Sequence, residues 1–231
     1  PPPPPPRPPR PPPPPAVAPT DYDWRKYGAV TSVKNQERVC RSGWAFSAVA
    51  ALEGITKIKA KVLYSLSAQE LVDCSTTSGC VSGWMHDAFK WVVDNKGINS
   101  EANYSYTGLT EPCQPQSSAS VANISSYDFV PPNNETALKD AVFRQPISIT
   151  IEARNFQFYT SGIYQGPCGY EMNHAVAAIG YGVDANATKF WILKNSWTTG
   201  WGEKGYMRLL RDYSDPRGLC GIAQKPSYPI Y

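Results

Sequence analysis

The chain has 231 residues, of which 42% are hydrophobic and 18% are charged, and its formal net charge is +3. This length can bury one large hydrophobic core or two smaller cores that share an interface. The small charge does not indicate a nucleic-acid partner or an anionic membrane, and no apolar stretch approaches the roughly 18 residues of a membrane-spanning helix. The chain does not begin with a basic and then apolar signal sequence, which predicts a processed form if the protein is secreted.

Proline dominates the beginning of the chain, where residues 1–19 hold 14 of the 23 prolines. Because proline fixes φ and has no amide hydrogen, a run such as Pro1–Pro6 is predicted to form polyproline II, within a Pro-rich N-terminal extension at residues 1–18. Arg7 and Arg10 are one turn of such a helix apart, so they would project from the same side. Two interpretations stay open: a stiff solvated tail, or a peptide that docks into an aromatic groove.

Four helices are predicted in the first two thirds of the chain. Ser42 is expected to cap the first, in which apolar residues recur at the three- and four-residue spacing of one buried face. A capping box of Ser67 and Glu70 begins the second helix, and Gly97 closes the third. The predicted helices comprise residues 44–59, 67–74, 84–95 and 135–143.

The C-terminal half changes to short runs rich in β-branched and aromatic residues, broken by Gly, Asn and Pro. An order of helices first and strands afterwards indicates an α+β fold or two subdomains. A cleft between two such halves is a common place for a functional site. The predicted strands comprise residues 147–153, 174–182, 189–197 and 205–212.

The cysteines and glycosylation sequons both indicate a secretory route. The six cysteines form an even set without CxxC spacing, which favours three disulfides in an oxidising compartment. With only two histidines in the chain, a zinc site is not expected. Four Asn-x-Ser/Thr sequons predict N-linked glycan. They begin at Asn103, Asn123, Asn134 and Asn186, and Asn123 and Asn134 are the preferred candidates.

Seven motifs occur in the order found in papain-like cysteine proteases, and together they cover essentially everything from Pro19 to Tyr231. The chain therefore resembles that family. The resemblance implies an α+β papain-like fold, with a helical subdomain at 19–125, an antiparallel barrel-like β subdomain at 126–231 and the cleft between them. The chain ends are expected to cross over between the subdomains. The motifs are DYDWRKYGAVTSVKNQ, SGWAFSAVAALEG, LSAQELVDC, GCVSGW, GPCGYEMNHAVAAIGYG, WILKNSWTTGWGEKGYMRL and CGIAQKPSYP.

The resemblance also implies how the cysteines pair. Two disulfides are expected in the helical half and one in the β half. An active family member carries one further, unpaired cysteine, which this chain lacks. The implied pairs are Cys40 with Cys80, Cys74 with Cys113, and Cys168 with Cys220.

The missing cysteine is the nucleophile. A cysteine protease needs a thiolate beside an imidazolium, and the family carries this thiol in a Cys-Gly-Ser-Cys-Trp run that opens the central helix. Here residues 40–44 read CRSGW, and Gly43 has no side chain that could form an acyl-enzyme. By resemblance, His174 is the catalytic base, Asn195 orients it, and Gln36 is the oxyanion-hole donor.

Two neighbouring departures indicate that the rest of this site has drifted. Three residues separate Gln36 from Cys40 where the family has two, and Arg41 replaces a glycine that lets substrate backbone lie close to the S1 wall. We therefore expect a displaced Gln36. The space left by the thiol is expected to bind a small anion or a peptide carbonyl between the helix start at Gly43 and His174.

The substrate cleft is assigned by the same resemblance. Gly83 would offer strand-like hydrogen bonds to an extended peptide, and Trp197 would shield the histidine and asparagine pair. Lys225 near the S2 floor would favour an acidic peptide side chain, although a solvated surface lysine is the alternative. The S2 pocket is assigned to Thr150, Met172, Asn173 and Lys225.

The sequence thus predicts a proteolytically inactive papain-like protein of the secretory pathway, vacuolar or extracellular. One hypothesis is a protein that binds peptides in the vestigial cleft; another is a storage or defence protein similar to inactive vacuolar seed proteins of plants. The alternative is a residual or unconventional peptide hydrolase. An extended peptide and N-linked glycan are the expected partners. No cofactor, metal, nucleic acid or membrane is expected, and no feature indicates an oligomeric state.

Overall fold

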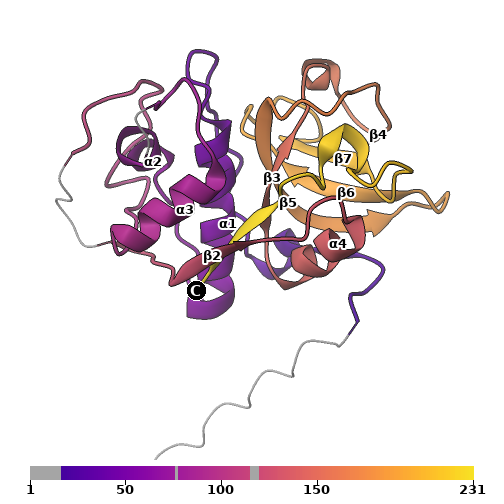
Figure 1. The fold of residues 1–231 in the computed structure, drawn as a ribbon, viewed down its shortest axis with the longest axis horizontal. Helices are drawn as coiled ribbons and strands as arrows, with labels where there is room; N and C mark the ends of the chain where they lie inside the picture. The colour runs from indigo at the N-terminus through magenta and orange to yellow at the C-terminus, as the bar shows by residue number, and fades with distance from the viewer. Residues whose placement is uncertain (1–16, 76–77, 115–119) are drawn as a thin grey trace, which may run out of the picture.

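The computed structural model describes residues 17–75, 78–114 and 120–231. The predicted extension at residues 1–18, with Arg7 and Arg10, lies almost entirely outside these residues. The described chain forms two halves that lie side by side, one mainly helical and one mainly of strands (Figure 1). This is the α+β papain-like arrangement that the resemblance implies.

All four predicted helices are present, with ends within two residues of those expected. The helical half holds the first three, and the fourth packs against the strands (Figure 1). Their bounds are α1 Gly43–Ala60, α2 Ala68–Cys74, α3 Met85–Asp94 and α4 Glu135–Arg144.

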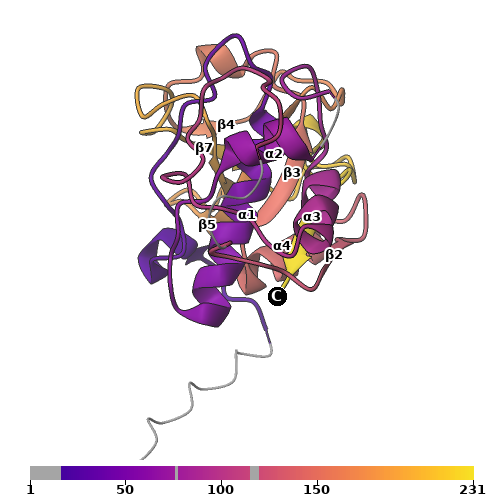
Figure 2. The same cartoon turned by 90° about the vertical axis from the view of Figure 1, so that its left-hand side faces the viewer.

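The long helix α1 differs from its prediction, because it is buried on all sides rather than on one face. Every residue from Gly43 to Thr56 is buried. The helix lies between α2 and α3 on one side and strands β3 (Ile147–Ile151) and β5 (His174–Val183) on the other (Figures 1 and 2). A helix enclosed by both halves needs apolar and small residues all round, which its alanines provide.

The predicted capping box at the start of α2 is made only in part. The Ser67 hydroxyl accepts a hydrogen bond from the Glu70 amide at 2.9 Å, as expected. The Ser67 amide, which a capping box pairs with Glu70, donates instead to the Asn99 carbonyl at 3.0 Å, and the Glu70 carboxylate accepts hydrogen bonds from the backbone and side-chain amides of Asn99 at 2.7 and 3.0 Å. A tertiary contact has therefore replaced half of the local motif.

The strands form one sheet in the order β2-β8-β3-β5-β6-β7-β4, with β1 paired to β5. All of its pairings are antiparallel except that between β4 and β7, which is parallel. The four predicted strands correspond to β3, β5, β6 and β7. The remaining bounds are β1 Tyr22–Asp23, β2 Ser126–Phe129, β4 Ile163–Tyr164, β6 Lys189–Lys194, β7 Tyr206–Leu210 and β8 Ser227–Ile230.

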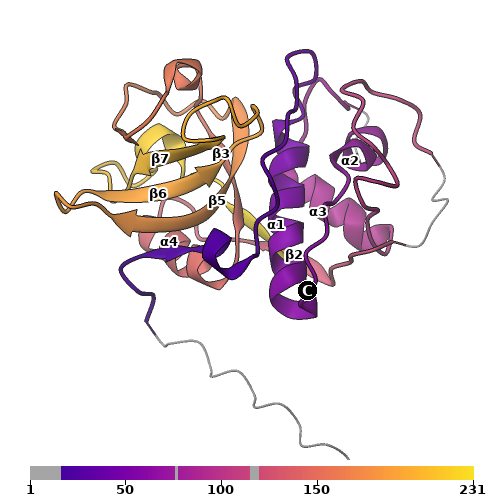
Figure 3. The ribbon, with the colours of Figure 1, turned by 180° about the vertical axis from the view of Figure 1, so that it is seen from behind.

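The two ends of the described chain cross between the halves. Strand β1 pairs with β5, and the Trp24 indole donates a hydrogen bond to the Val142 carbonyl at 2.7 Å, so the N-terminal segment lies on the strand-rich half (Figure 3). Strand β8 pairs with β2, and both contact α3 of the helical half. Each half is thus tied to the other by a terminal segment.

Three disulfides join Cys40 to Cys80, Cys74 to Cys113 and Cys168 to Cys220, which are the pairs that the resemblance implies. All six cysteines of the chain are used. Titration of the denatured, unreduced protein with a thiol reagent is therefore expected to give essentially no reactive thiol per chain. One or two equivalents would contradict this pairing.

All four sequon asparagines are exposed, so each side chain is accessible to a glycan. Asn134 also acts as the N-cap of α4, where its Oδ1 atom accepts a hydrogen bond from the Ala137 amide at 2.9 Å. Among the described residues, no helix combines the length and apolar character needed to cross a membrane.

Candidate functional site

The candidate site begins where α1 begins, at Gly43. Ser42 is the N-cap residue of this helix, as predicted, but its hydroxyl does not make the expected capping hydrogen bond. Tyr106 donates its hydroxyl proton to the Gln36 carbonyl at 2.7 Å, so Ser42 is the donor in the 2.6 Å hydrogen bond between the two hydroxyls. The Tyr106 ring is held in reach of Ser42 by its edge contact with Phe46.

His174 and Asn195 come together because β5 and β6 are neighbours in the sheet. His174 is the first residue of β5, and Asn195 follows β6 directly. The His174 Nε2 atom lies 2.9 Å from the Asn195 Oδ1 atom. Trp197 stacks on the imidazole at a centroid distance of 4.8 Å. The structure thus brings together His174, Asn195 and Trp197, which the resemblance assigns as the catalytic base, the residue that orients it and the ring that shields both.

The hydrogen bonds of Asn195 fix the tautomer of His174. The Asn195 Oδ1 atom also accepts a hydrogen bond from the Ser196 amide at 2.8 Å, so it is the acceptor in both interactions. His174 must therefore carry its proton on Nε2. In the neutral ring, the Nδ1 atom then presents a lone pair toward Gly43.

The space at Gly43 is not open, because the His174 ring occupies it. A Cβ atom at position 43 would lie 2.8 Å from both the Cε1 and Nδ1 atoms of His174 and 3.2 Å from the Gln36 Oε1 atom. The expected pocket for an anion or a carbonyl is therefore wrong. The acceptor on Nδ1 would also repel an anion placed between the ring and Gly43.

Gln36 is buried, and both ends of its side-chain amide are engaged. The Nε2 atom donates to the Cys40 carbonyl at 3.3 Å, and the Oε1 atom accepts from the Ser196 hydroxyl at 2.8 Å. The loop after Gln36 places Glu37 at a φ of 62°, which is uncommon for a residue with a side chain. The Gln36 Nε2 donor, which was expected in the oxyanion hole, therefore points toward the longer loop between Gln36 and Cys40.

Between the two halves lies a cleft of about 530 Å³ that includes this site. Its size is typical of a site for a small ligand or a few peptide residues. Gly83 forms part of its wall, and a Cβ atom there would clash with the Trp44 ring at 2.3 Å. The assigned residues that line the cleft are Gln36, Gly43, Gly83, Thr150, Met172, Asn173, His174 and Trp197.

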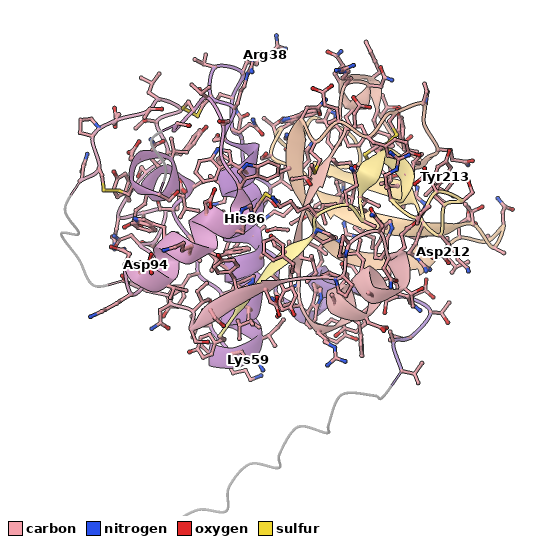
Figure 4. The ribbon with its side chains drawn as sticks, viewed as in Figure 1. Arg38, Lys59, His86, Asp94, Asp212 and Tyr213 are labelled. Carbon is pink, nitrogen blue, oxygen red and sulfur yellow. A yellow bond between two sulfur atoms is a disulfide. The ribbon has the colours of Figure 1, made fainter. Side chains whose placement is uncertain are left out.

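Lys225 is the assigned cleft residue that does not line the cavity. Its ammonium lies 4.1 Å from the centre of the Trp84 ring, which does line it. A cation–π contact thus holds the lysine against a residue of the wall, and the S2 assignment of Lys225 stays a prediction. His86, expected on a helix surface, packs between Trp84 and Phe129 at the junction of the halves (Figure 4).

Sequence reasoning missed several aromatic and polar residues of the cleft, since only the fold brings them to one wall. Trp44 and Thr150 are 3% and 5% exposed. Neither the Trp44 Nε1 atom nor the Thr150 hydroxyl has a hydrogen-bond partner among the described residues. The missed lining residues are Trp44, Val81, Ser82, Trp84, Glu171 and Ala175.

The fold and the paired histidine and asparagine define the class of papain-like cysteine proteases. Residues 18–230 match the papain family of cysteine proteases, and the chain belongs to this family. It is 49% identical to a senescence-specific cysteine protease of Oryza sativa subsp. japonica, over 91% of this chain and 63% of that protein. It is 50% identical to zingipain-2 of Zingiber officinale, over 92% of this chain and 96% of that protein.

Solved structures agree with this assignment. The bromelain protease from Ananas comosus, determined with a bound inhibitor, superposes with a TM-score of 0.90 at 48% identity, over 92% of this chain and 99% of that one. The chain spans about three fifths of the length of most curated relatives it matches.

His174 is expected to titrate with a pKa of about 4, and to remain the Nε2–H tautomer above it. Although one edge of the ring reaches the cleft, burial lowers its pKa from 6.5 to about 4, and the hydrogen bond to Asn195 opposes this only in part. A depressed histidine pKa stabilises the folded state fully above pH 6.5, and this contribution is lost as the pH falls from 6.5 toward 4.

Nitrogen-15 NMR of the imidazole measures both the pKa and the tautomer. A His174→Gln variant should lose the corresponding decline in unfolding free energy between pH 6.5 and 4. A pKa above 6.5 would mean that an anion faces the ring, and would contradict this account.

Proposed function

We propose that this chain is a proteolytically inactive member of the papain family that binds extended peptides in the cleft between its halves. The observation that carries the proposal is Gly43 at the start of α1, with the His174 ring in the space of the absent thiol. No atom at this position can attack a carbonyl. In a serine protease, removal of the nucleophile costs on the order of 10⁶ in turnover.

Other nucleophiles near Gly43 are engaged, which argues against an unconventional hydrolase. The Cys40 sulfur is in a disulfide with Cys80. Ser42 is fully buried, and its hydroxyl donates to Tyr106 rather than to a histidine. Ser82 and Thr150 also line the cleft, but among the described residues neither hydroxyl is hydrogen-bonded to His174, which pairs with Asn195 instead, so neither is activated as a nucleophile.

Peptide binding is favoured by what the cleft retains. Gly83 has no side chain, so its backbone is accessible for strand-like hydrogen bonds to an extended ligand. Trp84, Met172 and Trp197 also line the cleft and offer apolar surface that the side chains of a peptide can cover. The cleft can therefore recognise a peptide without cleaving it.

Three disulfides and four exposed sequons support a secretory setting, in the vacuole or outside the cell. A seed storage or defence role belongs to the same proposal. In a pure storage protein the cleft would be unused, so peptide affinity separates the two roles.

Isothermal titration calorimetry with a library of capped tetrapeptides, run beside a fluorogenic peptide assay, tests the proposal. We expect measurable binding and no turnover above buffer, with an active papain-family protease as the positive control. Turnover that survives affinity purification and is abolished by His174→Ala would refute inactivity. If no peptide binds, the peptide-binding role is refuted, and the storage or defence role is then the one that is supported.

A further inference from the structure

Of the charged side chains that line the cleft, one has an oppositely charged partner and one does not. Among the described residues that line it, the ionisable side chains are Arg41, Glu171 and His174. Glu171 forms an ion pair with Arg154 on the strand-rich half. His174 is neutral near pH 7, because burial holds its pKa at about 4. Arg41 has no carboxylate partner among the ion pairs of the described residues.

Arg41 is held in place by its own backbone. Its amide donates to the Cys80 carbonyl at 2.8 Å, and the adjoining residue Cys40 is bonded to Cys80 through a disulfide. The hydrogen bond and the disulfide thus both restrain the backbone at Arg41, while its side chain is exposed to the cleft. A fixed base with an exposed guanidinium can present two parallel donors to a carboxylate.

The start of α1 adds to the positive potential beside Arg41. The first amides of a helix carry partial positive charge. The Ser42 side chain does not accept a hydrogen bond from these amides, because its hydroxyl donates to Tyr106 instead of capping the helix. Arg41 and the helix start therefore favour a negative group on the same wall.

We propose that the peptide ligand of this cleft carries an aspartate or glutamate at the residue that lies opposite Arg41. This inference rests on the proposed peptide-binding function and specifies its ligand class. Because the pair would be exposed at one side, and the helix start adds a comparable contribution, we expect an acidic side chain to bind about 3- to 10-fold more tightly than its amide. The preference should fall as salt is added.

The experiment measures Kd for capped tetrapeptides in which each position in turn is aspartate or asparagine, at 50 mM and 500 mM NaCl. One position should show the acidic preference at low salt. Arg41→Gln should abolish that preference while asparagine peptides still bind. Arg38→Gln is the matched control, because Arg38 is on the same segment but does not line the cleft and lies at the upper edge of the molecule (Figure 4).

The outcomes separate this inference from the function on which it rests. Peptides that bind without acidic preference, or whose preference survives Arg41→Gln, would overturn the inference alone. An acidic preference removed by Lys225→Gln instead would place recognition at Lys225, beside Trp84, and would also overturn it. No binding by any peptide would overturn the proposed function as well.

Discussion

A cysteine introduced by Gly43→Cys is expected to be reactive but to recover only a small part of protease activity. The new Cβ atom would meet the His174 ring at 2.8 Å, so the imidazole must first move back. Once it does, a thiol at the start of α1 lies beside His174, which is the environment that lowers a thiol pKa. Alkylation by iodoacetamide near neutral pH should therefore be faster than for a free cysteine.

Turnover needs an oxyanion donor in addition to the thiolate. The Gln36 amide is bonded to the Cys40 carbonyl and must be redirected. Loss of one such donor costs about 10²–10³ in kcat, or roughly 3–4 kcal/mol. We expect Gly43→Cys to fall short of an active relative by at least about this factor. Deleting one residue from 37–39 and adding Arg41→Gly should then recover part of the deficit.

The measurement compares kcat/KM for the parent, the Gly43→Cys variant and the combined variant. Gly43→Ala is the control for the steric displacement of His174, and it should show neither alkylation nor turnover. Full activity from the single substitution would contradict the account of a drifted site. A combined variant with a reactive thiol and no turnover would place the defect in substrate binding.

The substitution Lys194→Met is expected to destabilise the protein by about 3–5 kcal/mol. Lys194 and Glu53 are 6% and 1% exposed and lie between the two halves, 3.9 Å apart. Thr31 joins them, since it accepts from the Lys194 ammonium at 2.8 Å and donates to the Glu53 carboxylate at 2.6 Å. Without Lys194, the buried carboxylate would lose its ion-pair partner and keep only the weaker influence of Lys34.

The pH dependence of this deficit has a definite sign. Burial already raises the pKa of Glu53, while Lys194 opposes that rise. In the variant the pKa of Glu53 rises further. A raised carboxyl pKa favours the folded state at low pH and costs stability as the pH rises, so the deficit should be largest near neutral pH and shrink toward pH 4.

Urea unfolding of the parent, Lys194→Met and Lys189→Met tests this prediction. Lys189 is the matched control, because it is on the same strand β6 but pairs with Asp212 at an exposed site, where such pairs contribute about 0–1 kcal/mol. Adding Glu53→Gln should recover much of the loss, since glutamine can still accept from the Leu66 amide. Equal effects of Lys194→Met and Lys189→Met would contradict the argument.

The fold and the missing nucleophile could both be predicted from the residues alone. Apolar periodicity, turn residues and ordered motifs predicted the four helices and the four longest strands, because these signals act over a few residues. The same motifs locate Gly43, His174 and Asn195. Because glycine has no side chain, the loss of the nucleophile at position 43 is known from the residue type alone.

The contacts of the remaining side chains could not be predicted in this way, because they are formed by segments far apart in the chain. Ser42 occupies the N-cap position without a capping hydrogen bond, because its hydroxyl pairs with Tyr106, 64 residues away. Lys225 stacks on Trp84 rather than lining the cleft. The His174 ring fills the space that a thiol would take. These outcomes depend on packing, burial and hydrogen-bond competition between distant segments, and none of these leaves a local pattern in the sequence.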